Sequence, residues 1–114
     1  MSERPDTLYL NDILDSICAI ENFIKDIDFG TFINDRKTRS ATIRELEVIG
    51  EAAGNISEGL KSLNADVDWR TIKDFRNVLS HEYFGIDDKI VWQIITEKLS
   101  PLKNKISVML HSIE

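Results

Sequence analysis

Residues 7–26 read TLYLNDILDSICAIENFIKD, and this stretch decides the fold. Its apolar residues recur at intervals of three and four, which is the spacing of an amphipathic helix. They are Leu10, Ile13, Leu14, Ile17, Ile20 and Ile24, and Ile27 continues the pattern just after the stretch. Asp6 or Thr7 can cap the first turn after Pro5. We therefore predict a helix from about Thr7 to Asp26.

A second helix is predicted after a break at Phe29-Gly30-Thr31. Asp35 can cap it, and its apolar pattern, which includes Leu46 and Ile49, ends near Ser57.

Two further helices follow the same logic. Asp68 precedes a third helix of roughly four turns, which stops near Gly85 because glycine is common just past a helix end. Asp87 can cap a fourth, which Pro101 kinks or restarts. No segment alternates as a strand does. The prediction is an all-α bundle of four to five helices.

Length and composition predict a single domain over residues 1–114. The chain is 42% hydrophobic, so a core can form without disulfides or a structural metal. The lone Cys18 excludes an internal disulfide and is expected to be buried in the first helix. No apolar run is long enough to span a bilayer, and no group of ligands has metal spacing. We expect a cytoplasmic protein without metal, cofactor or membrane contact.

The net charge of −6 is unevenly distributed. Residues 1–35 account for all of it, while residues 36–76 sum to +1 and residues 77–114 to −1. Four bases without an acid among them begin the second helix: Arg36, Lys37, Arg39 and Arg44. They are either a solvated helix start or a rim that contacts phosphate.

The chemistry concentrates at the end of the third helix, in residues 76–85, RNVLSHEYFG. Arg76 supplies a planar cation suited to phosphate, His81 can exchange a proton near neutral pH, and Tyr83 offers a hydroxyl. His81 could instead be an ordinary helix-end imidazole. Arg76 could pair with a nearby carboxylate such as Asp74, and Tyr83 could be packing.

One straight helix does not bring these three groups together. At about 100° per residue, His81 lies about 140° around the helix from Arg76, whereas Tyr83 nearly eclipses it. Either the helix unwinds before Gly85, or a second subunit contributes its own copy, which is the interpretation we favour. Metal-free RNA cleavage needs a base, an acid and positive charge, and a dimer supplies two His81 and two Arg76 side chains.

The spacing Arg76-x4-His81-x-Tyr83 resembles the R-x4-H-x-Y motif of the HEPN superfamily, in its HepT-like branch. The similarity extends to four other stretches, namely residues 6–14, residues 43–53, residues 67–70 and Val91-Trp92. It therefore covers nearly the whole chain.

This resemblance implies a helical bundle that dimerises through the motif-bearing helix, and a toxin that acts as a metal-independent RNase at the shared cleft. It assigns catalysis to Arg76 and His81, with Asn77 as the polar residue that follows the motif arginine. The implied partner is a minimal nucleotidyltransferase antitoxin that transfers AMP to Tyr83.

A second hypothesis comes from a different functional class. The chain could be a non-catalytic subunit that binds a nucleotide or substrate for a nucleotidyltransferase, and its acidic surface suits that role. Under the RNase hypothesis, the stretch from Arg36 to Arg44 could contact RNA or the nucleotide of the antitoxin.

Overall fold

The computed structural model describes residues 4–79 and 85–113, and residues 76–79 by their backbone alone. All regular structure in these ranges is helical, which confirms the predicted all-α class. The elements in chain order are α1 (Asp6–Phe23), α2 (Phe29–Asn34), α3 (Arg36–Asn55), α4 (Glu58–Leu63), α5 (Trp69–Leu79), α6 (Asp88–Gln93), the π-helical turn η1 (Ile94–Lys98) and α7 (Leu99–Ile113).

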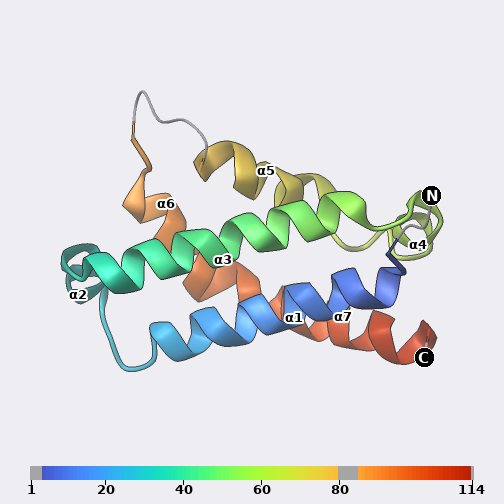
Figure 1. Ribbon diagram of the computed structural model, residues 1–114, viewed down its shortest axis with the longest axis horizontal. Coiled ribbons are helices and arrows are strands. Elements are labelled where there is room, and N and C mark those ends of the chain that lie inside the picture. The colour runs from blue at the N-terminus through green and yellow to red at the C-terminus, as the bar shows by residue number, and fades with distance from the viewer. Residues whose placement is uncertain (1–3, 80–84, 114) are drawn as a thin grey trace.

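α3 is the central helix of the bundle (Figure 1). α1 runs antiparallel to it on one side and α5 antiparallel on the other, while α7 packs against α1. The short helices α2 and α6 lie at the end of the molecule where α3 begins, and α4 lies at the opposite end. This topology brings the end of α5 and the start of α6 to the first half of α3.

The core consists of the aliphatic rows that the sequence pattern predicts. Leu10, Ile13, Ile17 and Ile20 of α1 are fully buried. Among the described side chains, the buried apolar residues of α3, α5 and α7 are Ile43, Leu46, Ile49, Ala52, Ala53, Ile72, Phe75, Leu99, Leu102, Ile106 and Met109. Burial of side chains of this size is the main stabilising contribution to such a bundle.

The first helix departs from the prediction at both ends. Pro5 occupies the N-cap and makes no side-chain cap bond, so the prediction of a cap at Asp6 or Thr7 is wrong. The Asp6 carboxylate instead accepts hydrogen bonds from the N–H and hydroxyl of Ser57, at 2.9 and 2.6 Å. The helix ends at Phe23 rather than near Asp26, because Asp26 adopts a left-handed φ of 61° that ends the helical path.

Two six-residue helices, α2 and α4, were not predicted. Phe29-Gly30-Thr31 begins α2 instead of forming a break, because Asp28 caps the Thr31 N–H at 2.8 Å. Ser57 caps α4 in the same way. Helices this short show too few turns for an apolar period, so a cap is the only local signal they carry.

The predicted caps Asp35 and Asp87 are confirmed, and Asp68, which precedes α5, is a further cap. Asp35 accepts hydrogen bonds from the N–H and hydroxyl of Thr38, at 3.2 and 2.7 Å. Asp68 accepts the same pair from Thr71, at 3.0 and 2.7 Å. Asp87 caps α6 through the Lys89 N–H. These bonds satisfy N–H groups that have no partner within the helix.

The chain around Pro101 matches the expected restart, except that no break in helical structure precedes it. α6, η1 and α7 follow one another directly, and Pro101 lies in the first turn of α7, just after the π-helical turn. Proline has no N–H to donate, and its ring crowds the carbonyl four residues earlier. A wide turn before it relieves that crowding without ending the helix.

Two further features bear on surface chemistry. Cys18 is exposed, so the expectation that it is buried is wrong: it falls one residue beyond the buried Ser16 and Ile17, on the outer side of α1. No helix in the described ranges has the length and apolar content needed to cross a membrane.

Candidate functional site

The last described turn of α5 carries the first two motif residues, Arg76 and Asn77. The preceding turns fix this helix to the core, because Ile72 and Phe75 are 4% and 5% exposed. The Trp69 indole N–H also donates to the Asn64 carbonyl at 3.1 Å, which holds the start of α5. The motif therefore begins on a helix whose position is set by apolar burial.

His81 and Tyr83 lie outside the described residues, as do the side chains of Arg76 and Asn77. The structure describes the chain on both sides of residues 80–84, and these flanks define how the motif is supported. The predicted continuation of the third helix toward Gly85 also falls within residues 80–84.

Downstream of the motif, Gly85 has a φ of 73°, a left-handed conformation that favours glycine. Ile86 is half-buried and packs against the core. Asp87 then caps α6 by accepting the Lys89 N–H at 2.9 Å. The chain thus re-enters regular structure through a turn, an apolar contact and a cap within three residues.

α6 is held to the bundle at both of its ends. At its end, the Trp92 ring lies 5.3 Å from the Phe32 ring and 6.0 Å from the Phe29 ring, in tilted arrangements that suit aromatic pairs. At its start, Arg39 Nε donates to Asp88 Oδ1 at 2.6 Å. Sequence analysis missed Asp88, whose only signal was a second acid after the capping Asp87.

The four bases predicted as a rim do not share one side of α3. Arg39 is half-buried and paired with Asp88, whereas Arg36, Lys37 and Arg44 are exposed. Lys37 and Arg44 are seven residues apart and nearly aligned, but each lies roughly 140–160° around the helix from Arg39. Arg44 is also 3.5 Å from Glu47. Arg36 is the exposed base nearest the α6 side, about 60° from Arg39.

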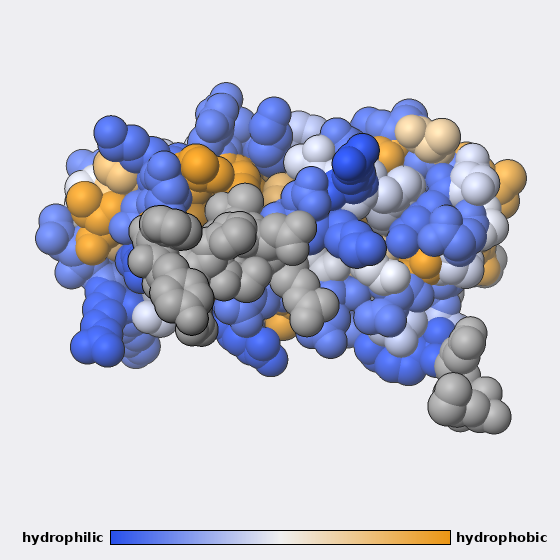
Figure 2. Space-filling model, turned by 90° about the horizontal axis from the view of Figure 1, so that it is seen from above, coloured by the Kyte–Doolittle hydropathy of each residue, from blue (hydrophilic) through white to orange (hydrophobic). Residues whose placement is uncertain are grey.

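The largest element of the acidic first third of the chain is α1, and α1 lies away from α5. α1 and α5 lie on opposite sides of α3 (Figure 1). Seen from the α5 side, the surface is mostly hydrophilic, with hydrophobic patches toward the end where α2 and α6 lie (Figure 2). Exposed apolar residues at that end include Ile33 of α2 and Ile90 of α6.

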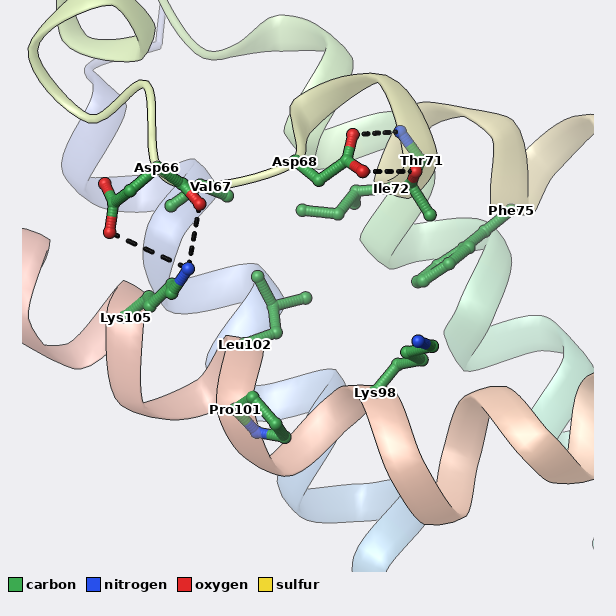
Figure 3. A pocket seen from close by; sticks show the side chains of 10 residues that line it. All are labelled: Asp66, Val67, Asp68, Thr71, Ile72, Phe75, Lys98, Pro101, Leu102 and Lys105. Carbon is green, nitrogen blue, oxygen red and sulfur yellow. Dashed lines mark hydrogen bonds and ion pairs between the residues drawn. The ribbon is translucent and has the colours of Figure 1, made fainter.

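A groove of about 320 Å³ lies between α5 and the segment from η1 to α7 (Figure 3). Phe75, Ile72 and Leu102 form part of its apolar lining, and Lys98 reaches into it from the π-helical turn. Lys105 donates to the Asp66 carbonyl at 2.8 Å, so its charge is engaged at the edge. The groove joins residues about thirty positions apart, which is why the sequence pattern did not reveal it.

The cap of α5 contributes one carboxylate to the lining of the groove. Hydrogen bonds from the hydroxyl and the N–H of Thr71 lower the pKa of Asp68, so this carboxylate stays ionised and turned toward its own helix. In residues 4–79 and 85–113, no three His, Cys, Asp or Glu side chains gather as they would around a metal ion.

The helical bundle and the motif that begins on α5 place the chain in the HEPN superfamily. The sequence profile of the family described as "Ribonuclease HepT-like" matches residues 13–109. The chain belongs to this HepT-like family.

The curated relatives agree with this assignment. The chain is 38% identical over 109 residues to "Putative RNase MJ1380" of Methanocaldococcus jannaschii, covering 96% of this chain and 100% of that protein. It is 42% identical over 97 residues to "Probable ribonuclease HepT" of Thermococcus cleftensis, covering 85% of this chain and 88% of that protein. No solved structure matches the chain significantly.

Proposed function

We propose that this protein is a metal-independent endoribonuclease, the toxin of a HEPN and minimal-nucleotidyltransferase toxin–antitoxin pair in the cytoplasm. The observation that carries the proposal is the Arg76-x4-His81-x-Tyr83 spacing in a chain that matches the HepT-like family over residues 13–109. The names of the relatives, a ribonuclease and an RNase, support the same reaction class.

The chemistry assigned to these residues is transfer of the RNA phosphate to the adjacent 2′-hydroxyl. His81 takes the proton of that hydroxyl or gives one to the departing 5′-oxygen, and Arg76 stabilises the charge on the phosphate in the transition state. Asn77 supports this site. The reaction cleaves the P–O5′ bond, forms a P–O2′ bond and needs no external oxidant or cofactor.

A second copy of the chain completes the site in this proposal. One chain has one His81, whereas the reaction uses both a base and an acid. A homodimer that forms through α5 brings two His81 and two Arg76 side chains to one cleft. A two-fold axis at that helix makes the contact self-complementary.

The antitoxin acts on Tyr83. A minimal nucleotidyltransferase joins AMP to the phenolic oxygen, with pyrophosphate leaving from the nucleoside triphosphate and the phenolic proton going to solvent. The product places a negative phosphodiester in the cleft, which repels RNA phosphate and blocks access.

RNA binding outside the cleft depends on the exposed bases at the start of α3. Arg36 is the best placed of them, because it is exposed and lies toward the α6 side. Lys37 and Arg44 can add only a more distant contribution. With a net charge of −6 on the whole chain, we expect weak and salt-sensitive binding.

The test is RNA cleavage by the purified protein in EDTA. We expect cleavage that falls by about 10²- to 10⁴-fold in His81→Ala and Arg76→Ala. His111→Ala is the matched control, because His111 is exposed at the end of α7 and is the other histidine of the chain. Unchanged cleavage in both motif variants would contradict the assignment, and nucleotide binding without any cleavage would favour the non-catalytic subunit instead.

A further inference from the structure

The ion pair between Arg39 and Asp88 has a position that the proposed catalytic roles do not explain. Arg39 lies in the first turn of α3, and Asp88 is the first residue of α6, 49 positions later. Their side chains are 29% and 28% exposed, and Nε and Oδ1 are 2.6 Å apart. A charge-assisted hydrogen bond with this degree of burial is stronger and less screened than an exposed surface pair.

The pair acts on the first turn of α6. This turn is the free end of a helical run that continues directly through η1 and α7. The later half of α6 is held by Trp92 against Phe32, with ring centres 5.3 Å apart. Its first turn has Asp87 as a local cap, but that cap contacts α6 itself and does not fix the helix to the bundle. The Arg39 contact does fix it.

This attachment lies immediately after the motif in the chain. Gly85 turns with a φ of 73°, Ile86 packs on the core, and Asp88 is bound to Arg39 two residues later. The upstream flank is fixed independently, by burial of Ile72 and Phe75 against α3. Contacts with the same helix, α3, therefore fix the position of both flanks of the motif.

We propose that Arg39 is a positioning residue: through Asp88 it fixes the point where the chain enters α6, and so fixes the downstream flank of the catalytic motif relative to α5. This inference rests on the proposed RNase function. It separates Arg39 from the exposed bases Arg36, Lys37 and Arg44, with which it shares charge but not surroundings.

The competing role for Arg39 is a direct contact with RNA phosphate, and the two roles predict different measurements. Loss of a phosphate contact weakens RNA binding and reduces the salt dependence of binding by roughly one counterion. Loss of a positioning contact lowers kcat while the RNA affinity and its salt dependence are retained, because small misplacements of reacting groups are costly to the chemical step.

The experiment compares Arg39→Gln, Asp88→Asn and the double variant, with kcat and KM for RNA cleavage and binding measured at several salt concentrations. We expect kcat to fall about tenfold or more in either single variant, and the double variant to be no worse than the singles, because all three remove one contact. KM stays within about twofold, and the salt slope does not fall by one counterion. Arg39→Lys, which keeps the charge without the Nε geometry, restores part of kcat.

Lys103→Gln is the matched control. It removes another ion pair between helices, in which Lys103 Nζ lies 2.8 Å from Glu21 Oε1 and joins α7 to α1. Neither of these helices carries the motif, so kcat is expected to stay within about twofold although the folded state loses a comparable contact. A fall in kcat equal to that of Arg39→Gln would show a general effect of stability and overturn the proposal.

A second measurement does not depend on catalysis. Amide hydrogen exchange of residues 86–91 is expected to rise in Arg39→Gln and Asp88→Asn, with α1 and α7 unchanged. Unchanged exchange in that segment would overturn the proposal whether or not RNA is cleaved. If exchange rises but the parent protein shows no cleavage that depends on His81, the RNase proposal fails and the attachment of α6 stands. A reduced salt slope for Arg39→Gln alone would assign Arg39 to phosphate binding instead.

Discussion

The side of the bundle formed by α1, α3 and α7 differs in construction from the side formed by α5 and α6. The first buries long aliphatic rows, and the row of α1 has no exposed surface at Leu10, Ile13, Ile17 and Ile20. The second ends in α6, whose later half has the fully buried Val91 and a tilted aromatic pair, and whose start has a cap and one ion pair. Loss of side-chain volume from an apolar core lowers the stability of the whole fold. Loss of a directional contact releases the one segment that this contact positions. In the chain, the motif joins α5, which is held by the buried Ile72 and Phe75, to the start of α6, which is held by the ion pair with Arg39.

The largest effect on stability is expected for Leu46→Ala, on the side formed by α1, α3 and α7. Leu46 has no exposed surface in α3, so its truncation leaves a cavity and should lower the free energy of unfolding by about 2–5 kcal/mol. Urea denaturation measures this change. Leu63→Ala is the control, because Leu63 is 83% exposed and its loss should change stability by about 0.5 kcal/mol or less. Equal effects at the two sites would refute the assignment of the core.

Smaller effects on stability are expected at two glycines, and these two effects have opposite signs. Gly85 has a φ of 73°, so Gly85→Ala should destabilise the fold by about 1–2 kcal/mol through backbone strain alone. Gly54 lies within α3 with nothing close to the place a Cβ would take, so Gly54→Ala should stabilise by about 0.5 kcal/mol. The thermal unfolding midpoints of the two variants distinguish backbone strain in the turn next to the motif from helix propensity in α3. Two shifts of the same sign would contradict this explanation.

The smallest expected effect is a pH dependence that comes from the helix caps. The Thr31 N–H lowers the pKa of Asp28, and the Thr38 and Thr71 hydroxyls and N–H groups lower those of Asp35 and Asp68. Because each folded-state pKa lies below the ordinary value of 3.8, the stabilisation is complete above that value and is lost as the pH falls through the folded-state pKa.

The measurement for the caps is stability in urea between about pH 5 and pH 2. Replacing all three aspartates with asparagine keeps an acceptor at each cap and should make the loss of stability on acidification less steep. Asp15→Asn, at an exposed position in α1, is the control for removing a carboxylate elsewhere. An unchanged acid profile in the triple variant would remove the caps as its cause.

The sequence predicts the long helices well because their signal is periodic and repeated. Ile13, Ile17 and Ile20 are spaced as a buried face requires, and all three are buried. Asp35 and Asp87 were predicted as caps because each precedes a long or clearly apolar segment. α2 was missed because Phe29-Gly30-Thr31 suggests a turn, and only Asp28, three residues before Thr31, indicates a helix start.

The residue types of the candidate site stay a prediction from the sequence, whereas its support could not be predicted. Arg76, His81 and Tyr83 stand at a recognisable spacing, which a single sequence reveals. The Arg39–Asp88 contact spans 49 residues, and no local pattern predicts which base will meet which acid across that distance. For the same reason, the sequence groups Arg39 with Lys37 and Arg44, although helix geometry sends them in different directions.

The exposed thiol of Cys18 makes the assembly itself open to measurement. It is the one cysteine of the sequence and lies on α1, across α3 from α5. A spin label or fluorophore attached there marks each chain at a single point, so two associated copies form one pair of probes. Association through α5 holds the two probes on the outer sides of the assembly, and association through α1 brings them together. The natural protein thus carries a reporter of its own symmetry.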